Sequence, residues 1–307
     1  MKRGGVWLAV AAVSFLAAGV CFFSVLNREK EKKDTAEMYE EMRREAVSSG
    51  KDTTGADGGK DTSVSTKTDT ETDIPAASGT DDGDVSGRED SADTEHETEP
   101  LPSWELLYED DLVIPVDFEK LQEINSDIYA WITVGGTDID YPVVQNREDN
   151  TYYLTRSAEG EESFSGAIFS ENCNATDFND VHTVLYGHNM KDGSMFAGLH
   201  KFEDEEFFEE NRGINVYTPD AVRSYRIFAA YLYDDRHLIE SADCTDPRVF
   251  EAYMKEVFGQ RNLYAHVDGK MTVEPGDHIL TLSTCHNSGD GYRYLVQAVL
   301  EKEVRKI

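Results

Sequence analysis

Aromatic residues are missing from a long part of this 307-residue chain. None of its Phe, Trp and Tyr residues falls between Glu40 and Ser103, and most lie from Trp104 onward. A stretch without aromatic side chains buries too little apolar surface to offset the entropy that its ordering would cost. We therefore expect a disordered, low-complexity spacer at residues 28–100, between an apolar segment at residues 1–27 and a folded domain at residues 101–307. That domain is long enough to bury a full core.

Positive charge is also scarce in this chain. Lys and Arg together number 29, against 61 Asp and Glu, and the net charge is -32. Nucleic acid has to be met by clustered cations, so this excess of acid argues against a nucleic-acid partner. Much of the acid lies in the spacer, where mutual repulsion is expected to keep the chain extended and soluble.

Cysteine is rare, and the four thiols belong to Cys21, Cys173, Cys244 and Cys285. This number is too small for a scaffold built on disulfides. The three cysteines beyond the apolar segment cannot all pair with one another, so at least one thiol is free or pairs between chains. Whether Cys173 and Cys244 pair is left open by the sequence.

The chain has one long hydrophobic run, which begins at Val6, ends at Leu26 and carries no charge. As a helix this run spans about 31 Å, close to the hydrocarbon thickness of a bilayer. A cleaved signal peptide would have a shorter apolar region that ends in small residues, whereas Phe22 and Phe23 stand here. We therefore expect an uncleaved membrane anchor. Basic residues flank both of its ends, so charge alone does not decide which side the domain faces.

The sequence of the domain predicts a mainly β fold. Short runs typical of strands, separated by Gly, Asn and Asp, lie at residues 129–134, 139–144, 166–169, 183–186, 214–217, 223–233, 278–284 and 292–299. Many short strands at such spacing favour a barrel or a sandwich. Two helices are expected as well. One begins at the N-cap residue Asp117 and runs to residue 124, and the other covers residues 248–261 after Asp246 and Pro247.

Cys285 is the first candidate for chemistry, because it stands at the end of a predicted strand. Strand alternation puts it on one polar face with Thr281 and Ser283, whereas an unreactive cysteine more often lies among hydrophobic residues. The next strand forms a hairpin that returns Arg293 to the same end. A guanidinium there would favour the thiolate and could stabilise a developing oxyanion.

An acid or base partner for this thiol has several candidates. His188 follows Tyr186 and Gly187, where a strand run stops, so its imidazole also lies at a strand end. His286 is adjacent to Cys285, but neighbours in a strand point to opposite faces, which makes it the weaker partner. The other domain histidines have no comparable setting and are expected to be surface or packing residues; they are His182, His200, His237, His266 and His278. The residue pattern alone leaves the cysteine–histidine pair open.

An ordered set of motifs resembles the sortase family. These are the segment LYGHNM at residues 185–190, the segment TLSTC at residues 281–285, and Arg293 before an apolar strand. Residues 136–145, Asp149-Asn150 with Tyr153-Leu154, residues 191–196 and the two expected helices are similar to class B members. The resemblance runs from about residue 118 to residue 304. It implies an eight-stranded β-barrel with an N-terminal helix and a helix inserted before the cysteine strand.

The resemblance also implies an activity, that of a membrane-bound cysteine transpeptidase of Gram-positive bacteria. Cys285 would attack the threonine carbonyl of a C-terminal sorting signal on an exported protein and form a thioacyl enzyme. His188 would protonate the departing amine, and Arg293 would position the substrate and stabilise the oxyanion. An amine of a cell-wall precursor would then take the acyl group. The N-terminus would be cytoplasmic and the catalytic domain extracellular, on a single-pass anchor.

Substrate-binding residues follow from the same resemblance: Asn150, Leu154, Ser283 and Thr284 would line the signal-binding groove. Leu154 can instead be a core residue, and Ser283 and Thr284 ordinary strand residues. His286 stands where class B members often have an acid. The acidic run at residues 203–206 has the pattern of a solvated helical face rather than of a calcium site. We expect neither a metal nor another cofactor.

Three alternative functions are left open by the sequence. A pilin-polymerising sortase would use a lysine of another protein as its acceptor amine. A thiol hydrolase would pass the acyl group to water, and a non-catalytic surface module would only bind peptide signals.

Overall fold

The computed structural model describes residues 30, 33–46, 104–286 and 291–307. Across this part of the chain, no helix is both long enough and apolar enough to cross a membrane. The expected anchor and most of the expected spacer lie outside the described residues, so both assignments stay predictions.

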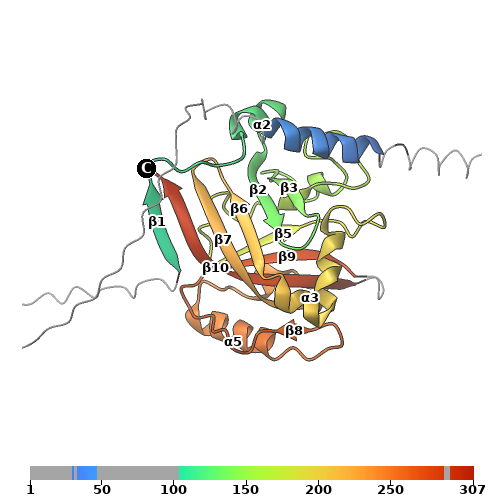
Figure 1. The fold of residues 1–307 in the computed structure, drawn as a ribbon. Coiled ribbons are helices and arrows are strands. Elements are labelled where there is room, and N and C mark those ends of the chain that lie inside the picture. Colours follow the sequence, from blue (N-terminus) through green and yellow to red (C-terminus); the bar gives the residue numbers. More distant parts are fainter. Residues whose placement is uncertain (1–29, 31–32, 47–103, 287–290) are drawn as a thin grey trace, which may run out of the picture. The chain divides into compact units, whose positions relative to one another are not determined.

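Eight strands close into a barrel (Figure 1). They are β2 (Ile128–Val134), β3 (Asp140–Val144), β4 (Ile168–Ser170), β5 (His182–Tyr186), β6 (Gly213–Tyr217), β7 (Ala221–Asp234), β9 (Ile279–Cys285) and β10 (Tyr292–Lys306). Neighbouring strands pair in the order β10-β9-β5-β4-β3-β2-β6-β7, and a further pairing of β7 with β10 closes the barrel. The mainly β fold and the eight-stranded barrel are therefore confirmed.

Two further strands were not expected from the sequence. β1 (Glu105–Glu109) pairs in parallel with the end of β10, and its side chains are mostly exposed, so it lacks the alternation of a half-buried strand. β8 (His266–Val267) pairs with β7 over two residues only, too few for a sequence pattern.

Both expected helices are present. α2 (Phe118–Ile124) follows Asp117, whose side chain accepts a hydrogen bond from the backbone N–H of Lys120. α5 (Pro247–Phe258) is capped in the same way by Asp246 and has proline in its first turn. The shorter helical elements are η2 (Tyr152–Leu154), η3 (Phe196–Glu203), α3 (Glu205–Glu210) and α4 (Leu238–Ser241).

A helix at residues 33–46 differs from the expected spacer boundary, because it belongs to the folded unit (blue in Figure 1). Tyr39, Met42 and Ala46 are buried in the main core. The Tyr39 hydroxyl donates to the carbonyl of Gly166 at 3.2 Å. Arg43 forms an ion pair with Asp140 at 2.9 Å. The helical spacing of 39, 42 and 46 is the signal for this docking, and charged residues around these positions obscured it.

The core lies on both sides of β9. Leu280 and Leu282 belong to the main core cluster, while Ile279 packs in a second cluster with the buried residues of α5. The Thr281 hydroxyl accepts a hydrogen bond from Gln297 of β10 at 2.9 Å, and Gln297 also donates to the hydroxyl of Tyr253 on α5, so this helix covers the polar face of β9. Thr281 and Ser283 are buried, and Cys285 is the residue of β9 that emerges into solvent.

Candidate active site

Cys285 is exposed at the end of β9, whose six preceding residues are all buried. Arg293 lies directly opposite it on β10, in the antiparallel register expected from the hairpin. The guanidinium nitrogen Nη1 donates to Sγ of Cys285 at 2.7 Å. This contact sets a cationic donor directly against the sulfur that is expected to be the nucleophile.

His188 follows β5, which runs in parallel beside β9. The N–H of Gly187 donates to the carbonyl of Ser283 at 3.2 Å. In the other direction, the Thr284 hydroxyl donates to the carbonyl of Gly187 at 2.8 Å. These bonds hold the chain that enters His188 against the chain that enters Cys285. The three residues predicted to carry the chemistry therefore lie at the same end of the barrel.

The imidazole of His188 is anchored to backbone. Its Nε2 lies 2.7 Å from the carbonyl oxygen of Leu154. A carbonyl only accepts, so we infer that Nε2 carries the proton and that Nδ1 holds the lone pair in the neutral ring. Gly166 makes room for this arrangement at a positive φ of 59°, because a Cβ there would lie 3.1 Å from Cδ2 of His188. Among the described residues, the thiol of Cys285 is hydrogen-bonded to Arg293 and not to His188.

The four predicted groove residues lie in two kinds of surroundings. Leu154 ends η2 with a side chain that is 38% exposed, so it is not a core residue. Asn150 accepts a hydrogen bond from the backbone N–H of Asn172 at 2.8 Å. Ser283 and Thr284 are buried, and the Thr284 hydroxyl is already bonded to Gly187. The role of the four residues in holding a peptide stays a prediction.

Two side chains that contact the backbone carbonyl of Cys285 were not predicted from the sequence. Asn189 donates through Nδ2 to the carbonyl oxygen of Cys285 at 3.0 Å. Nε2 of His200 lies 3.1 Å from the same oxygen. Asn189 stands beside His188 in the chain, so that motif could have indicated it. His200 comes from η3, far from the cysteine in sequence, and no local pattern indicated it.

The other two cysteines in the described residues are free and do not pair. Burial raises the pKa of the Cys244 thiol to about 11, which keeps it protonated and unreactive. The pKa of Cys173 is also raised, first by partial burial and then by the neighbouring carboxylate of Glu171. Of the three described thiols, Cys285 is the one with a cationic hydrogen-bond donor.

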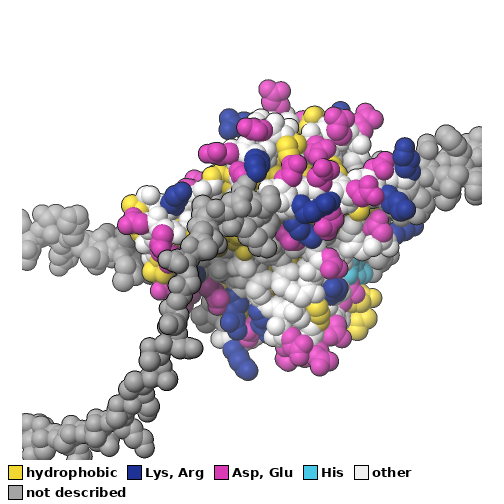
Figure 2. Space-filling view, turned by 45° about the horizontal axis from the view of Figure 1, so that its top comes forward, with side chains coloured by type: hydrophobic (Ala, Val, Ile, Leu, Met, Phe, Trp, Pro, Cys, Tyr) yellow, Lys and Arg dark blue, Asp and Glu magenta, His cyan; other side chains and the backbone are white. Residues whose placement is uncertain are grey.

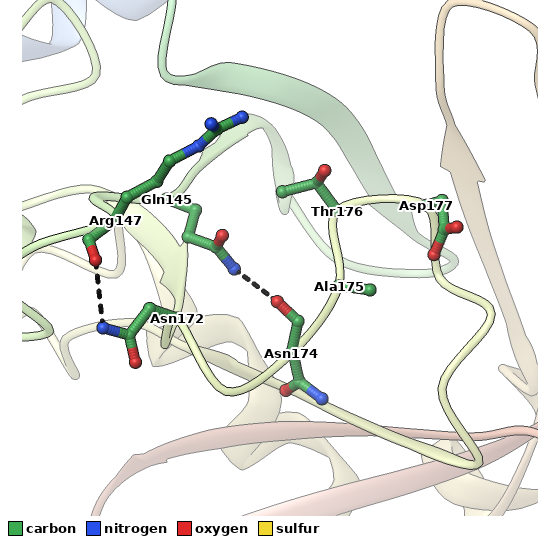
Figure 3. Close-up of a pocket in the computed structure, with 7 residues that line it drawn as sticks. All are labelled: Gln145, Arg147, Asn172, Asn174, Ala175, Thr176 and Asp177. Atoms are coloured by element: carbon green, nitrogen blue, oxygen red, sulfur yellow. Dashed lines mark hydrogen bonds between the residues drawn. The ribbon is translucent and has the colours of Figure 1, made fainter.

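A polar cavity of about 480 Å³ opens beside the loop that follows β3 (Figure 3). It is lined by Gln145, Arg147, Asn172, Asn174, Ala175, Thr176 and Asp177. Gln145 donates to the carbonyl of Asn174, and Asn172 donates to that of Arg147. These amides are used to hold the loops together, and the lining contains no thiol or imidazole. On the face shown in Figure 2, Lys and Arg side chains are interspersed with acidic ones.

Comparisons with known proteins show which family this chain resembles. The sortase domain model matches residues 132–301. Sortase B of Listeria monocytogenes is 35% identical over 180 residues, which cover 57% of this chain and 69% of that protein. Sortase B of Staphylococcus aureus is 30% identical over 171 residues, which cover 56% and 68%.

Solved structures extend the likeness to the fold. The structure of Clostridium perfringens sortase B is 33% identical with a TM-score of 0.55, over 60% of this chain and 99% of that one. The structure of Bacillus anthracis sortase B in complex with AAEK2 is 36% identical with a TM-score of 0.54, over 60% and 82%. The matched domain spans more than half of the chain, beginning within β2 and ending within β10. This chain belongs to the sortase family, with relatives among the class B members, and is a cysteine transpeptidase that acts on sorting signals.

Proposed function

We propose that Cys285, His188 and Arg293 carry the transpeptidation and that the acceptor is an amine of the cell wall. The observation that carries this assignment is the 2.7 Å hydrogen bond from Arg293 to the exposed thiol of Cys285. His188 supports it, because the parallel pairing of β5 with β9 brings the imidazole to the same end of the barrel.

In the first step the thiolate of Cys285 attacks the carbonyl carbon of the sorting signal. A C–S bond forms, and negative charge develops on the carbonyl oxygen. The guanidinium of Arg293 has five N–H donors in one plane, so one can hold sulfur while another stabilises the oxyanion. The C–N bond then breaks, and the imidazolium of His188 gives its proton to the departing amine.

In the second step the thioester is resolved by the acceptor. Neutral His188 takes a proton from the incoming amine, whose nitrogen attacks the carbonyl carbon. The C–S bond breaks and the Cys285 thiolate is released. Anchoring of His188 at Leu154 keeps the ring at one position through both proton transfers. The expected groove residues Asn150, Leu154, Ser283 and Thr284 belong to this proposal as the binders of the signal.

The membrane location is also part of the proposal. The uncharged run from Val6 to Leu26 would anchor the chain in the cell membrane as a single pass. The N-terminus would then be cytoplasmic and the barrel extracellular, where exported substrates and wall precursors meet it. The acid-rich segment after the anchor would serve as a tether.

The test uses the full chain in detergent with a panel of sorting-signal peptides and an amine acceptor, read by mass spectrometry. We expect an acyl adduct on Cys285 that the amine resolves into a ligated peptide. The adduct should be absent in Cys285→Ala and retained in Cys173→Ala, its matched control. Release of the acyl group to water alone, with amine present, would establish a hydrolase instead. Binding of a peptide without an adduct would establish a peptide-binding module.

A further inference from the structure

A second group of ionisable side chains lies next to Cys285, apart from His188 and Arg293. His200 and Glu203 come from η3, and His286 is the residue that follows Cys285. Nδ1 of His200 lies 2.5 Å from Oε1 of Glu203, and Nε2 of His286 lies 3.2 Å from the same oxygen. One ligand atom from each of the three residues falls within 4.8 Å of the other two.

The surroundings of these atoms suit a small site that solvent can reach. The side chains of His200, Glu203 and His286 are 18%, 25% and 6% exposed. The ring of Tyr294 stacks on His200, and the ring of Tyr264 lies against His286 with centroids 5.0 Å apart. These rings restrict both imidazoles before any ligand arrives, which lowers the entropy lost on binding.

The hydrogen bonds of His200 indicate what the group can hold. Its Nε2 faces the carbonyl oxygen of Cys285 at 3.1 Å, and a carbonyl only accepts, so this nitrogen carries a proton. Nδ1 lies at hydrogen-bond distance from the carboxylate of Glu203, so a proton lies between these two atoms when no ion is bound. A divalent cation can replace that proton once the two side chains move apart, because two ligands of one Zn²⁺, each about 2.0 Å from it, lie roughly 3.3 Å from each other. Histidines that bind metals show the same arrangement, with the other ring N–H donated to a backbone carbonyl.

We propose that His200, Glu203 and His286 bind a divalent transition-metal ion of the Zn²⁺ class. Two imidazole nitrogens and one carboxylate oxygen form a donor set found in zinc sites, with a fourth position left for water. Ca²⁺ and Mg²⁺ prefer oxygen ligands and are disfavoured by the two imidazoles. The ion would join η3 to the residue that follows Cys285 and so hold the end of β9. This site goes beyond the proposed transpeptidation and does not depend on it.

The test is calorimetric titration of the full chain with Zn²⁺ alone. The two exposed thiols of the described residues, and Cys21 outside them, are first replaced by Cys173→Ser, Cys285→Ser and Cys21→Ser, so that none of these sulfurs takes up the ion. We expect one high-affinity Zn²⁺ per chain and at least a tenfold loss of affinity in Glu203→Gln and in His286→Asn. Glu206→Gln, an exposed neighbour on α3, should leave the affinity unchanged. Co²⁺ should give the visible absorption of a tetrahedral site in the parent and lose it in the variants.

Equal Zn²⁺ affinity in the parent, Glu203→Gln and His286→Asn would overturn the proposal, as would the absence of binding at millimolar Zn²⁺. Circular dichroism confirms that each variant is folded before titration. If Glu203→Gln does not fold, His286→Asn decides. Because the readout is binding rather than turnover, failure of this site and failure of the proposed transpeptidation are separate results.

Discussion

Arg293→Lys should lower kcat/KM even though it keeps the positive charge. The guanidinium lies 2.7 Å from Sγ of Cys285, at the β10 position directly opposite the cysteine. The N–H donors of a guanidinium lie in one plane and can bind the sulfur and the oxyanion at the same time. The ammonium of lysine is a compact charge on a flexible side chain and lacks this planar arrangement of donors. Arg293→Met removes both the charge and the donors.

The magnitudes follow from these contacts. Loss of one oxyanion donor typically lowers kcat by about 10²–10³, or roughly 2.7–4 kcal/mol. A hydrogen bond to a charged group adds about 1.5–3 kcal/mol. We therefore expect Arg293→Lys to lose roughly 10²-fold in kcat/KM and Arg293→Met about 10³-fold or more.

Two assays separate the contributions of Arg293. Cleavage of a quenched fluorescent sorting peptide, with an amine acceptor present, gives kcat/KM. Alkylation of Cys285 by iodoacetamide across pH reports the thiolate alone. Arg236→Met is the matched control, since Arg236 is an exposed arginine paired with Asp234. A kcat/KM for Arg293→Met within threefold of the parent would refute the reasoning.

Three further outcomes are expected. His188→Gln should lower kcat by about 10²–10⁴-fold. The alkylation rate of Cys285 should stay nearly unchanged, because the thiol is hydrogen-bonded to Arg293 and not to His188. A parallel fall in kcat and in the alkylation rate would contradict this geometry. Met42→Ala should reduce the free energy of unfolding by about 2–4 kcal/mol in chemical denaturation, because Met42 is buried in the main core. Its control Glu37→Ala, at an exposed position of the same helix, should change that free energy by less than about 0.5 kcal/mol. Equal effects of the two substitutions would show that the helix at residues 33–46 is not docked. Burial lowers the pKa of His182 from 6.5 to about 4, so the unfolded chain takes up this proton first and stability falls as pH drops from about 6.5 to about 4. This loss should reach ~3 kcal/mol and be absent in His182→Gln, and parallel pH profiles for the two proteins would rule it out.

Local patterns in the sequence determined most of the barrel. Each of its eight strands has a run of β-forming residues bounded by turn residues. Asp117 and Asp246 are N-cap residues, and each predicts the helix that follows it. The position of Cys285 at a strand end and the hairpin that returns Arg293 also follow from local order. These features were predictable because they depend on residues that are near one another in the chain.

Tertiary structure decided the surroundings of that thiol. Alternation put Thr281 and Ser283 on the face of Cys285, but only the packing of α5 shows that this face is covered. The sequence predicts residues 33–46 as part of a charged spacer, whereas in the structure they form a helix whose three buried apolar residues pack in the main core. His200 and Glu203 reach the segment of Cys285 from η3, more than 80 residues away. No local pattern encodes such a meeting, because the closure of the barrel brings these segments together.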